Sequence, residues 1–510
     1  MKILLVDPFG DKDATGLNLG IAYCAGNLRK RGHTVSVLDL NNIRAGDSKD
    51  RLKEAVETYR PDAVGFSVMS LSYYGAMDLA NDMRPYYKGL IIFGGAEVSA
   101  QKERVLAFSD SIDIVVVGEG DVALAEIADL FDRGQLDSLN EVKGIIWKKD
   151  GRVVINPPRP LLKELDSLPF PDFEVFGVRK LDHYALLTSR GCPFNCSFCF
   201  QSPYSGSTWR SRNVDRCIDE LKYAIEKYEI KVLQICDPCF NASSKRVEDF
   251  CSALIREKID LPWYAIGVRA DRVTPAMAEL MRKSGCRRVW LGIESLHEDV
   301  FNRIGKGETI EDIKKGIKIF QKEGIQVHGY LVMGLPGDTF KKTLYSCEEA
   351  LKLNLDALSF SSAVPFSGTG LEKWIQEKNA RLLLDPLTIS CVGSEYGNVA
   401  YETDDFKLNE RKKARYILQV KAQSYEERKL KRWLFLLKKA YLVARYDHKN
   451  LLGRFRRSLR YRANKQHIAQ FTQEQFISFG RIPDGTWGLN NNDAVLSSPE
   501  EVKIDIRAIT

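Results

Sequence analysis

The sequence predicts an α/β fold with two parallel sheets and a mostly α-helical C-terminal region. Three observations support this. Short apolar runs alternate with amphipathic stretches in two separate series, a proline-rich passage stands between the series, and long basic segments follow the second. A chain of 510 residues with 44% hydrophobic content can bury more than one core. We therefore expect several domains in one chain.

The first series predicts a doubly wound domain of the Rossmann or flavodoxin-like type over residues 1–140. Glycines follow several of its strand ends, and ligands of such sheets bind at that edge. No GxGxxG motif follows the first strand, which argues against an ordinary dinucleotide site. The expected strands are Ile3–Val6, Val35–Leu38, Ala63–Val68, Leu90–Phe93 and Asp113–Val117.

The second series predicts a partial (βα)6 barrel over residues 184–375. It follows a proline-rich stretch, residues 141–183, which we interpret as a linker because proline resists regular structure. In parallel barrels the chemistry gathers at the carboxyl ends of the strands. The expected strands are Tyr184–Ser189, Val232–Cys236, Trp263–Arg269, Arg288–Glu294, Gln326–Gly334 and Ala357–Pro365.

The region 376–510 is predicted to be mostly helical and is strongly basic. Residues 407–465 hold 20 Lys and Arg but four acidic residues, in a chain of net charge +7. The stretch Lys431–Val443 joins an apolar block to flanking cations. It predicts either a packed helix with solvated cations or an interfacial helix on an anionic membrane surface. We expect no nucleic acid, because no binding motif accompanies the charge.

Composition also limits the compartment. The apolar start of the chain is interrupted at Asp7, and no stretch reaches the ~18 apolar residues of a membrane span. The cysteine count is eleven, without an export signal, so a disulfide framework is not expected. We expect a cytoplasmic monomer, with a membrane-peripheral location as the alternative.

Three cysteines directly after the first barrel strand predict a metal centre. Cys192, Cys196 and Cys199 lie within eight residues. Thiolates are the usual ligands of iron–sulfur clusters, and three of them leave one iron of a four-iron cluster open to a small molecule. A structural zinc site is the alternative, but such sites usually have four protein ligands, and no matching second pair accompanies the triplet.

The triplet, with the aromatic Phe198 before its last cysteine, resembles the signature of the radical S-adenosylmethionine (SAM) superfamily. The resemblance covers about residues 180–375. It implies that Gly292-Ile293-Glu294-Ser295 is the fourth-strand motif, in which Glu294 holds the SAM ribose hydroxyls and Ser295 lies beside it. It implies that Gly334, in Gly334-Leu335-Pro336-Gly337, closes the fifth strand near the adenine.

One element of that family is missing. Cys236-Asp237-Pro238-Cys239 stands where the family has glycine-glycine-glutamate. We expect Asp237 to replace it at the SAM amino group and Cys239 to face the cavity, which makes both candidate catalytic residues, whereas Cys236 packs in the core. Arg269 is expected to pair with the SAM carboxylate, with a surface ion pair as the alternative.

The first domain resembles the cobalamin-binding domain that precedes many radical SAM barrels. The matching segments are Gly20-Ile21-Ala22-Tyr23, Arg31-Gly32-His33, Pro61 to Ser67, Phe93-Gly94-Gly95 and Val117-Gly118-Glu119-Gly120. The resemblance implies cobalamin contacts from Ser67, Met69, Tyr73, Gly94, Gly95, Gly118 and Glu119. The motif that supplies an axial histidine is absent, and His33 is interpreted as a turn residue. A flavodoxin-like domain without cofactor is the alternative.

Together the two resemblances imply a cobalamin-dependent radical SAM enzyme with a 4Fe–4S cluster, SAM and cobalamin as cofactors. Such an enzyme generates a 5′-deoxyadenosyl radical and most often methylates an unactivated carbon. A radical rearrangement, C–C coupling or cyclisation without methyl transfer is the alternative reaction, and a non-catalytic cobalamin or iron sensor is the alternative class. The expected partners are a small-molecule or lipid-like substrate and a flavodoxin- or ferredoxin-type reductant.

Overall fold

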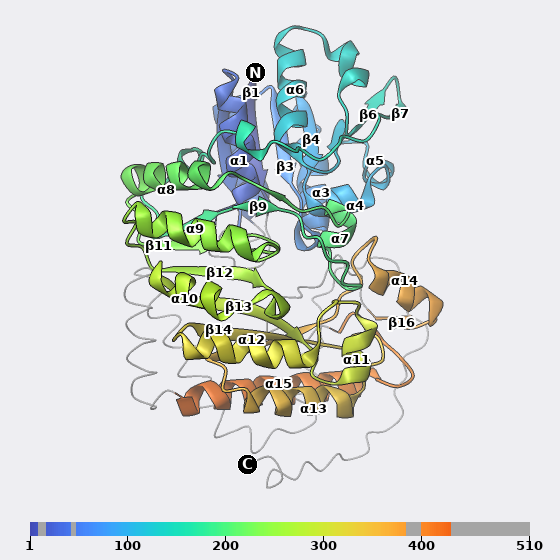
Figure 1. The fold of residues 1–510 in the computed structure, drawn as a ribbon. Coiled ribbons are helices and arrows are strands. Elements are labelled where there is room, and N and C mark those ends of the chain that lie inside the picture. The colour runs from blue at the N-terminus through green and yellow to red at the C-terminus, as the bar shows by residue number, and fades with distance from the viewer. Residues whose placement is uncertain (9–16, 42–46, 384–398, 430–510) are drawn as a thin grey trace. The chain divides into compact units, whose positions relative to one another are not determined.

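The computed structural model describes residues 1–8, 17–41, 47–383 and 399–429 (Figure 1). Its first sheet has seven strands in the order β2-β1-β3-β4-β5-β6-β7. The first five run parallel, which confirms the predicted doubly wound domain. The strands are β1 (Lys2–Asp7), β2 (Thr34–Asp39), β3 (Ala63–Ser67), β4 (Leu90–Gly94), β5 (Ile114–Val116), β6 (Ile145–Lys149) and β7 (Arg152–Ile155).

Helices cover both faces of this sheet because its strands are apolar on both sides. In β1, Leu4 and Val6 join one buried cluster with helices α2 and α3, whereas Ile3 and Leu5 join another with α1 and α6. The helices are α1 (Leu19–Lys30), α2 (Ser48–Tyr59), α3 (Tyr73–Met83), α4 (Ala96–Gln101), α5 (Arg104–Phe108) and α6 (Gly120–Asp132). Short 3-10 turns are η2 (Ser70–Ser72), η3 (Leu136–Glu141), η4 (Leu165–Ser167) and η5 (Glu174–Phe176).

The predicted boundary at residue 140 ends the first sheet two strands early. β6 pairs antiparallel with β5, and β7 pairs antiparallel with β6, so both strands belong to the sheet and not to a linker. The proline-rich pattern that suggested a linker begins only at Pro157, and the apolar run from Ile145 to Trp147 was too short to stand out beside it. The irregular connection is therefore shorter than predicted.

The second sheet has six strands in the order β15-β14-β13-β12-β11-β8, all parallel, as predicted for a partial barrel. The strands are β8 (His183–Leu186), β11 (Val232–Ile235), β12 (Trp263–Val268), β13 (Cys286–Glu294), β14 (Gln326–Met333) and β15 (Ala357–Ser362). The helices are α8 (Val214–Tyr228), α9 (Ser244–Arg256), α10 (Pro275–Lys283), α11 (Glu298–Arg303), α12 (Ile310–Lys322) and α13 (Phe340–Lys352), with the turn η6 (Ala270–Arg272).

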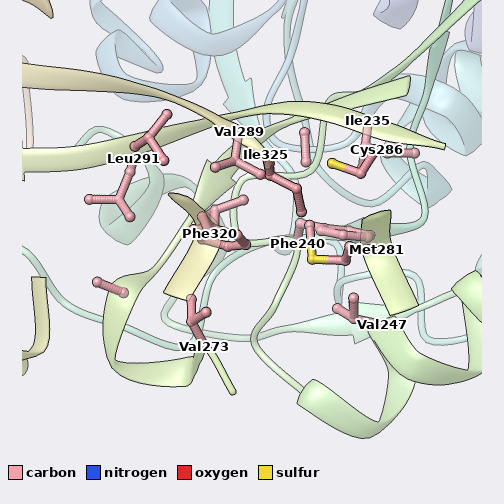
Figure 2. Close-up of a cluster of buried hydrophobic side chains, with 14 of the residues drawn as sticks. Ile235, Phe240, Val247, Val273, Met281, Cys286, Val289, Leu291, Phe320 and Ile325 are labelled. Atoms are coloured by element: carbon pink, nitrogen blue, oxygen red, sulfur yellow. The ribbon is translucent and has the colours of Figure 1, made fainter. Parts of the chain in front are cut away.

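Side-chain caps begin these helices where the strands have ended. Asn213, Ser243, Thr274, Thr309 and Thr339 each accept a hydrogen bond from a backbone N–H of the helix that follows. The helices then pack an apolar stripe on the outer face of the sheet. Figure 2 shows this core, where Phe320 of α12, Met281 of α10 and Val247 of α9 lie among strand residues.

The described part of the C-terminal region packs on the last strands. It contains α14 (Gly370–Glu377), the short strands β16 (Arg381–Leu382) and β17 (Tyr401–Glu402), and α15 (Leu408–Lys429). Phe406, Ala414 and Leu418 bury against Met333 and Cys347. The basic stretch Lys431–Val443 lies outside the described residues. None of the described helices is both long and apolar enough to span a membrane.

Candidate active site

A short hairpin leads into the cysteine loop. β9 (Ser189–Arg190) pairs antiparallel with β10 (Arg210–Ser211), and the short helix α7 (Gln201–Ser205) lies between them in the chain. Cys192, Cys196 and Cys199 are all half-buried. The Cys199 amide donates to the Cys196 carbonyl at 3.0 Å, and the Ser197 amide donates to the Ile304 carbonyl at 2.8 Å. The second of these hydrogen bonds ties the loop to the end of α11 in the barrel.

The loop residues fit an iron–sulfur cluster. In a cubane the three thiolates bind three different irons, so they need not converge on one point. Among the described residues, no three His, Cys, Asp or Glu side chains converge as a single metal ion requires. Burial raises the pKa of the Cys196 thiol to about 12, while the nearby charges of Lys306 and Arg269 act in the opposite direction. A hydrogen bond from Cys239 lowers the pKa of Cys192 to about 6.

The Cys236-to-Cys239 segment differs from the prediction. Cys239 is 1% exposed and its thiol hydrogen-bonds that of Cys192, whereas Cys236 is the more accessible of the two. The Asp237 carboxylate is equally buried. It accepts from the amide and hydroxyl of Thr188 and from the Ser189 hydroxyl, each at 2.6 Å. Asp237 therefore anchors the start of the cysteine loop, which replaces its predicted contact with the SAM amino group.

Glu294 ends β13 beside a lysine that sequence reasoning missed. The pairing of β13 with β14 shifts between Gly292 and Glu294, and Glu294 adopts a φ of 61°. Lys306 places its Nζ 3.2 Å from Glu294 Oε1 and 2.9 Å from Glu308 Oε1, and it also donates to the Gly292 carbonyl. Burial opposes the charge on Lys306, but the two carboxylates outweigh it and raise its pKa. The only sequence signal was a lysine between Gly305 and Gly307.

Arg269 is committed to protein partners. Its Nε and Nη2 bind the Asp271 carboxylate at 2.9 and 3.2 Å, and its Nη1 donates to the Lys306 carbonyl at 2.8 Å. Its guanidinium also lies 3.5 Å from the ring centre of Phe194. The structure thus shows an ion pair, as the alternative to a SAM carboxylate contact supposed, but the pair is buried and does not lie on the surface. Arg269 ties the cysteine loop to the segment that contains Lys306.

Three other barrel residues that the sequence predicted for the site differ in their surroundings. The Ser295 hydroxyl lies 3.0 Å from that of Ser346 and is buried, so it fixes the turn after β13 and does not face a ligand. Gly334 has a φ of 85°, and its carbonyl accepts from Tyr401, so the C-terminal region covers this turn. Phe198 packs partly buried against the barrel core.

The first domain brings several predicted residues to its carboxyl edge. A Cβ on Gly95, whose φ is 108°, would lie 2.5 Å from the Val68 carbonyl oxygen, so only glycine permits this contact. Gly94 ends β4, and Ser67, at the end of β3, accepts from Asn18 at 3.2 Å. Met69 is 52% exposed.

Two of its predicted cofactor residues are corrected. Tyr73 is 1% exposed, because its side chain lies on the apolar face of α3 and packs into the core of the first domain. Glu119 forms a bidentate ion pair with Arg210, so its carboxylate serves the hairpin of the barrel. His33 lies buried with its ring nitrogens 3.1 Å from Asp129 and Asp132, which agrees with a structural role. Gly118, before Glu119, has a φ of 86° and no atom within 4 Å of a hypothetical Cβ.

Comparison with known proteins gives matches in both halves of the chain. Residues 186–350 match the family described as "Radical SAM superfamily", and residues 13–128 match "B12 binding domain". The chain is 30% identical over 397 residues to an "Uncharacterized methyltransferase PH0819" of Pyrococcus horikoshii, covering 76% of this chain and 85% of the relative. It is 26% identical over 378 residues to "Anaerobic magnesium-protoporphyrin IX monomethyl ester cyclase" of Rubrivivax gelatinosus, covering 70% and 66%.

Among solved structures, the fold is similar to that of the radical S-adenosylmethionine methyltransferase TsrM from Kitasatospora setae. The TM-score is 0.67 at 18% identity, covering 83% of this chain and 88% of that one. That structure has cobalamin and a 4Fe–4S cluster bound. At this identity the likeness shows a shared fold.

Proposed function

Since the chain belongs to the radical SAM superfamily and carries a B12-binding domain, we propose that it is a cobalamin-dependent radical SAM methyltransferase acting on carbon. The observation that carries the proposal is the half-buried cysteine loop at the carboxyl edge of the barrel, beside Glu294 and Lys306. The relative that is 30% identical is named a methyltransferase, which favours methyl transfer over cyclisation.

Three groups of residues would hold the cofactors. Cys192, Cys196 and Cys199 would ligate the 4Fe–4S cluster, which when bound supplies the electron that cleaves SAM. Glu294, held in place by Lys306, would accept hydrogen bonds from the SAM ribose. The edge formed by Ser67, Met69, Gly94, Gly95 and Gly118 would hold cobalamin, which when bound supplies the methyl group.

The protein's own contribution is placement. Asp237 fixes the start of the cysteine loop through hydrogen bonds from Thr188 and Ser189. Arg269, held by Asp271 and the Lys306 carbonyl, packs its guanidinium over Phe194 of the loop. Tyr401 and Arg411 cover the turn at Gly334, so the described C-terminal residues help to close that side of the barrel against water. Lys306 balances the charge of Glu294 and Glu308 before any ligand arrives.

The direct test counts iron and methyl groups. Anaerobically reconstituted protein should hold about four irons per chain, and replacing the three cysteines of the loop with alanine should remove them. With SAM, hydroxocobalamin and a reductant of flavodoxin or ferredoxin type, the product should gain the methyl group of isotopically labelled SAM. Full iron content in the triple variant, or 5′-deoxyadenosine formation with an unmethylated product, would contradict the proposal.

For the substrate we propose a small molecule, lipid-like in character. The basis is the basic stretch Lys431–Val443, whose cations can bind anionic headgroups at about 1 kcal/mol each, with Trp433 at headgroup depth. This would make the enzyme membrane-peripheral. In sedimentation at low salt, binding to anionic liposomes should exceed binding to neutral ones, and equal binding would contradict the lipid proposal.

A further inference from the structure

Two arginines flank the cysteine loop in the chain, one on each strand of the β9–β10 hairpin. Arg190 in β9 pairs in register with Arg210 in β10, and Cys192 follows Arg190 by two residues. A Cβ on Gly191 would lie 2.0 Å from the Thr208 carbonyl oxygen, so the loop begins in tight backbone contact with the segment before β10. Any displacement of the hairpin therefore displaces the first cysteine as well.

Both arginines reach the first domain. Arg190 binds the Asp121 carboxylate through Nη1 and Nη2 at 2.7 and 3.1 Å. Arg210 binds the Glu119 carboxylate in the same bidentate way at 3.0 and 2.6 Å. Glu119 and Asp121 stand at the start of α6, in the turn that follows β5. Two parallel guanidinium–carboxylate pairs thus join the two halves of the described chain.

The four charges are balanced and shielded. The side chains of Arg190 and Asp121 are 15% and 8% exposed, and those of Arg210 and Glu119 are 9% and 12% exposed. Arg190 also lies 5.2 Å from the ring centre of Tyr23. A shielded bidentate pair fixes the orientation of both side chains as well as neutralising their charges, whereas water weakens the attraction in an exposed pair. We name these four residues the clamp.

The acidic side of the clamp is continuous with the proposed cobalamin edge. Gly118 immediately precedes Glu119, and its amide donates to the Ser99 hydroxyl at 2.9 Å. Its carbonyl accepts from the Tyr204 hydroxyl at 3.3 Å, and Tyr204 belongs to α7 within the hairpin insert. The same turn therefore lies at the proposed cofactor edge of the first domain and contacts α7, which directly follows the cysteine loop in the chain.

We propose that Glu119 and Asp121 are positioning residues that couple the two cofactor sites, so that cobalamin and the cluster each strengthen the binding of the other. The proposal rests on the proposed function, since it assumes both cofactors. Ordering of the Gly118 turn by cobalamin would fix the carboxylates, which in turn fix Arg190 and the loop at Cys192. Such coupling is reciprocal, because both effects measure one free energy.

The experiment measures that reciprocity without turnover. The dissociation constant of hydroxocobalamin is determined with cluster-loaded and with iron-stripped full-length protein, and the rate of iron loss to a chelator is determined with and without hydroxocobalamin. In the wild type we expect cobalamin to bind about fivefold or more tightly when the cluster is present, and to slow iron loss. These measurements give two ratios: the hydroxocobalamin dissociation constant without the cluster over that with it, and the rate of iron loss without hydroxocobalamin over that with it. In Asp121→Asn and Glu119→Gln both ratios should fall towards one.

Matched variants separate coupling from general destabilisation. Glu126→Gln is the control variant. Glu126 lies on α6, as Asp121 does, but its bidentate pair is with Arg159 and not with an arginine of the hairpin. Its replacement should leave both ratios unchanged. Arg190→Lys keeps the buried charge while losing the fork, and should lower both ratios even if Asp121→Asn fails to fold. Asp121→Glu should restore them in part.

The outcomes are distinguishable from failure of the proposed function. Wild-type protein that binds no hydroxocobalamin would overturn the proposed function and the coupling with it. Protein that binds both cofactors with ratios of one, or whose ratios persist in Asp121→Asn, Glu119→Gln and Arg190→Lys, would overturn only the coupling.

Discussion

At the scale of single residues, burial decides which candidate side chains can meet a ligand. Asp237, Ser295 and Tyr73 are each at most 4% exposed, so they act on neighbouring protein groups. Cys192, Cys196 and Glu294 keep partial exposure at the carboxyl edge of the barrel. Residue type alone did not separate these groups, because aspartate and serine are as suited to anchoring a loop as to binding a cofactor.

Asp237→Ala should destabilise both the fold and the cluster loop. Three donors of Thr188 and Ser189 would lose their acceptor in a buried position, which we expect to lower the free energy of unfolding by about 3 kcal/mol. Iron loss to a chelator should be faster than in the wild type. Asp219→Ala, at an exposed position of α8, is the control and should change neither quantity; equal behaviour of the two variants would refute the anchoring role.

Asp7 should make the cofactor-free protein less stable as the pH rises. Burial raises its pKa from 3.8 to about 6, with Asn18 hydrogen bonding in opposition. The folded state therefore holds the proton more tightly, so stability is lost as the pH increases from about 4 to 6. Relative to Asp7→Asn, the wild type should lose about 3 kcal/mol between pH 4 and pH 7 in urea unfolding. A difference that does not vary with pH would contradict this.

At the scale of elements, strand alternation places the site. Along β13, Val289, Leu291 and Ile293 are buried in the outer core, and the residues between them face the other side of the sheet. The register shift before Glu294 then turns the carboxylate toward Lys306. The outer core is what holds this strand in register, so its packing is part of the site.

Phe320→Ala tests that support. The side chain is fully buried between α12 and the strands (Figure 2), and its truncation should cost about 3–5 kcal/mol of unfolding free energy. Lys318→Ala, exposed on the same helix, should cost less than about 0.5 kcal/mol. The check is urea unfolding followed by tryptophan fluorescence, and similar midpoints for both variants would show that α12 is not required by the barrel core.

At the scale of the whole described chain, the clamp joins the start of α6 in the first domain to the β9–β10 hairpin that leads into the cysteine loop. The two larger sheets have their own buried clusters, and Ala22 of α1 joins the cluster of the barrel. The proposed cobalamin edge and the cysteine loop are therefore connected through the ion pairs of the clamp.

Bound hydroxocobalamin should show no histidine ligation. His33 is held between Asp129 and Asp132, away from the glycine edge, and the motif that supplies an axial histidine is absent from the sequence. The expected measurement is the absorbance spectrum of the bound hydroxocobalamin, together with the electron paramagnetic resonance spectrum after its reduction to the cobalt(II) form, without histidine coordination and identical in His33→Ala. Nitrogen coordination that persists in His33→Ala would mean that the first domain has been misinterpreted.

The sequence by itself determined the two parallel sheets, the place of the cysteine loop and the motif at Glu294. The sheets and the cysteine loop follow from local periodicity and from spacing along the chain, which neighbouring residues record, whereas the motif at Glu294 was implied by the resemblance to the radical SAM superfamily. Tertiary structure alone decided the partners of Asp237, Arg269 and Glu119, the burial of Lys306, and the two antiparallel strands that extend the first sheet. The pairs of Lys306 with Glu294 and of Glu119 with Arg210 join residues 12 and 91 positions apart, and charge pairing across such separations depends on packing that no local pattern records.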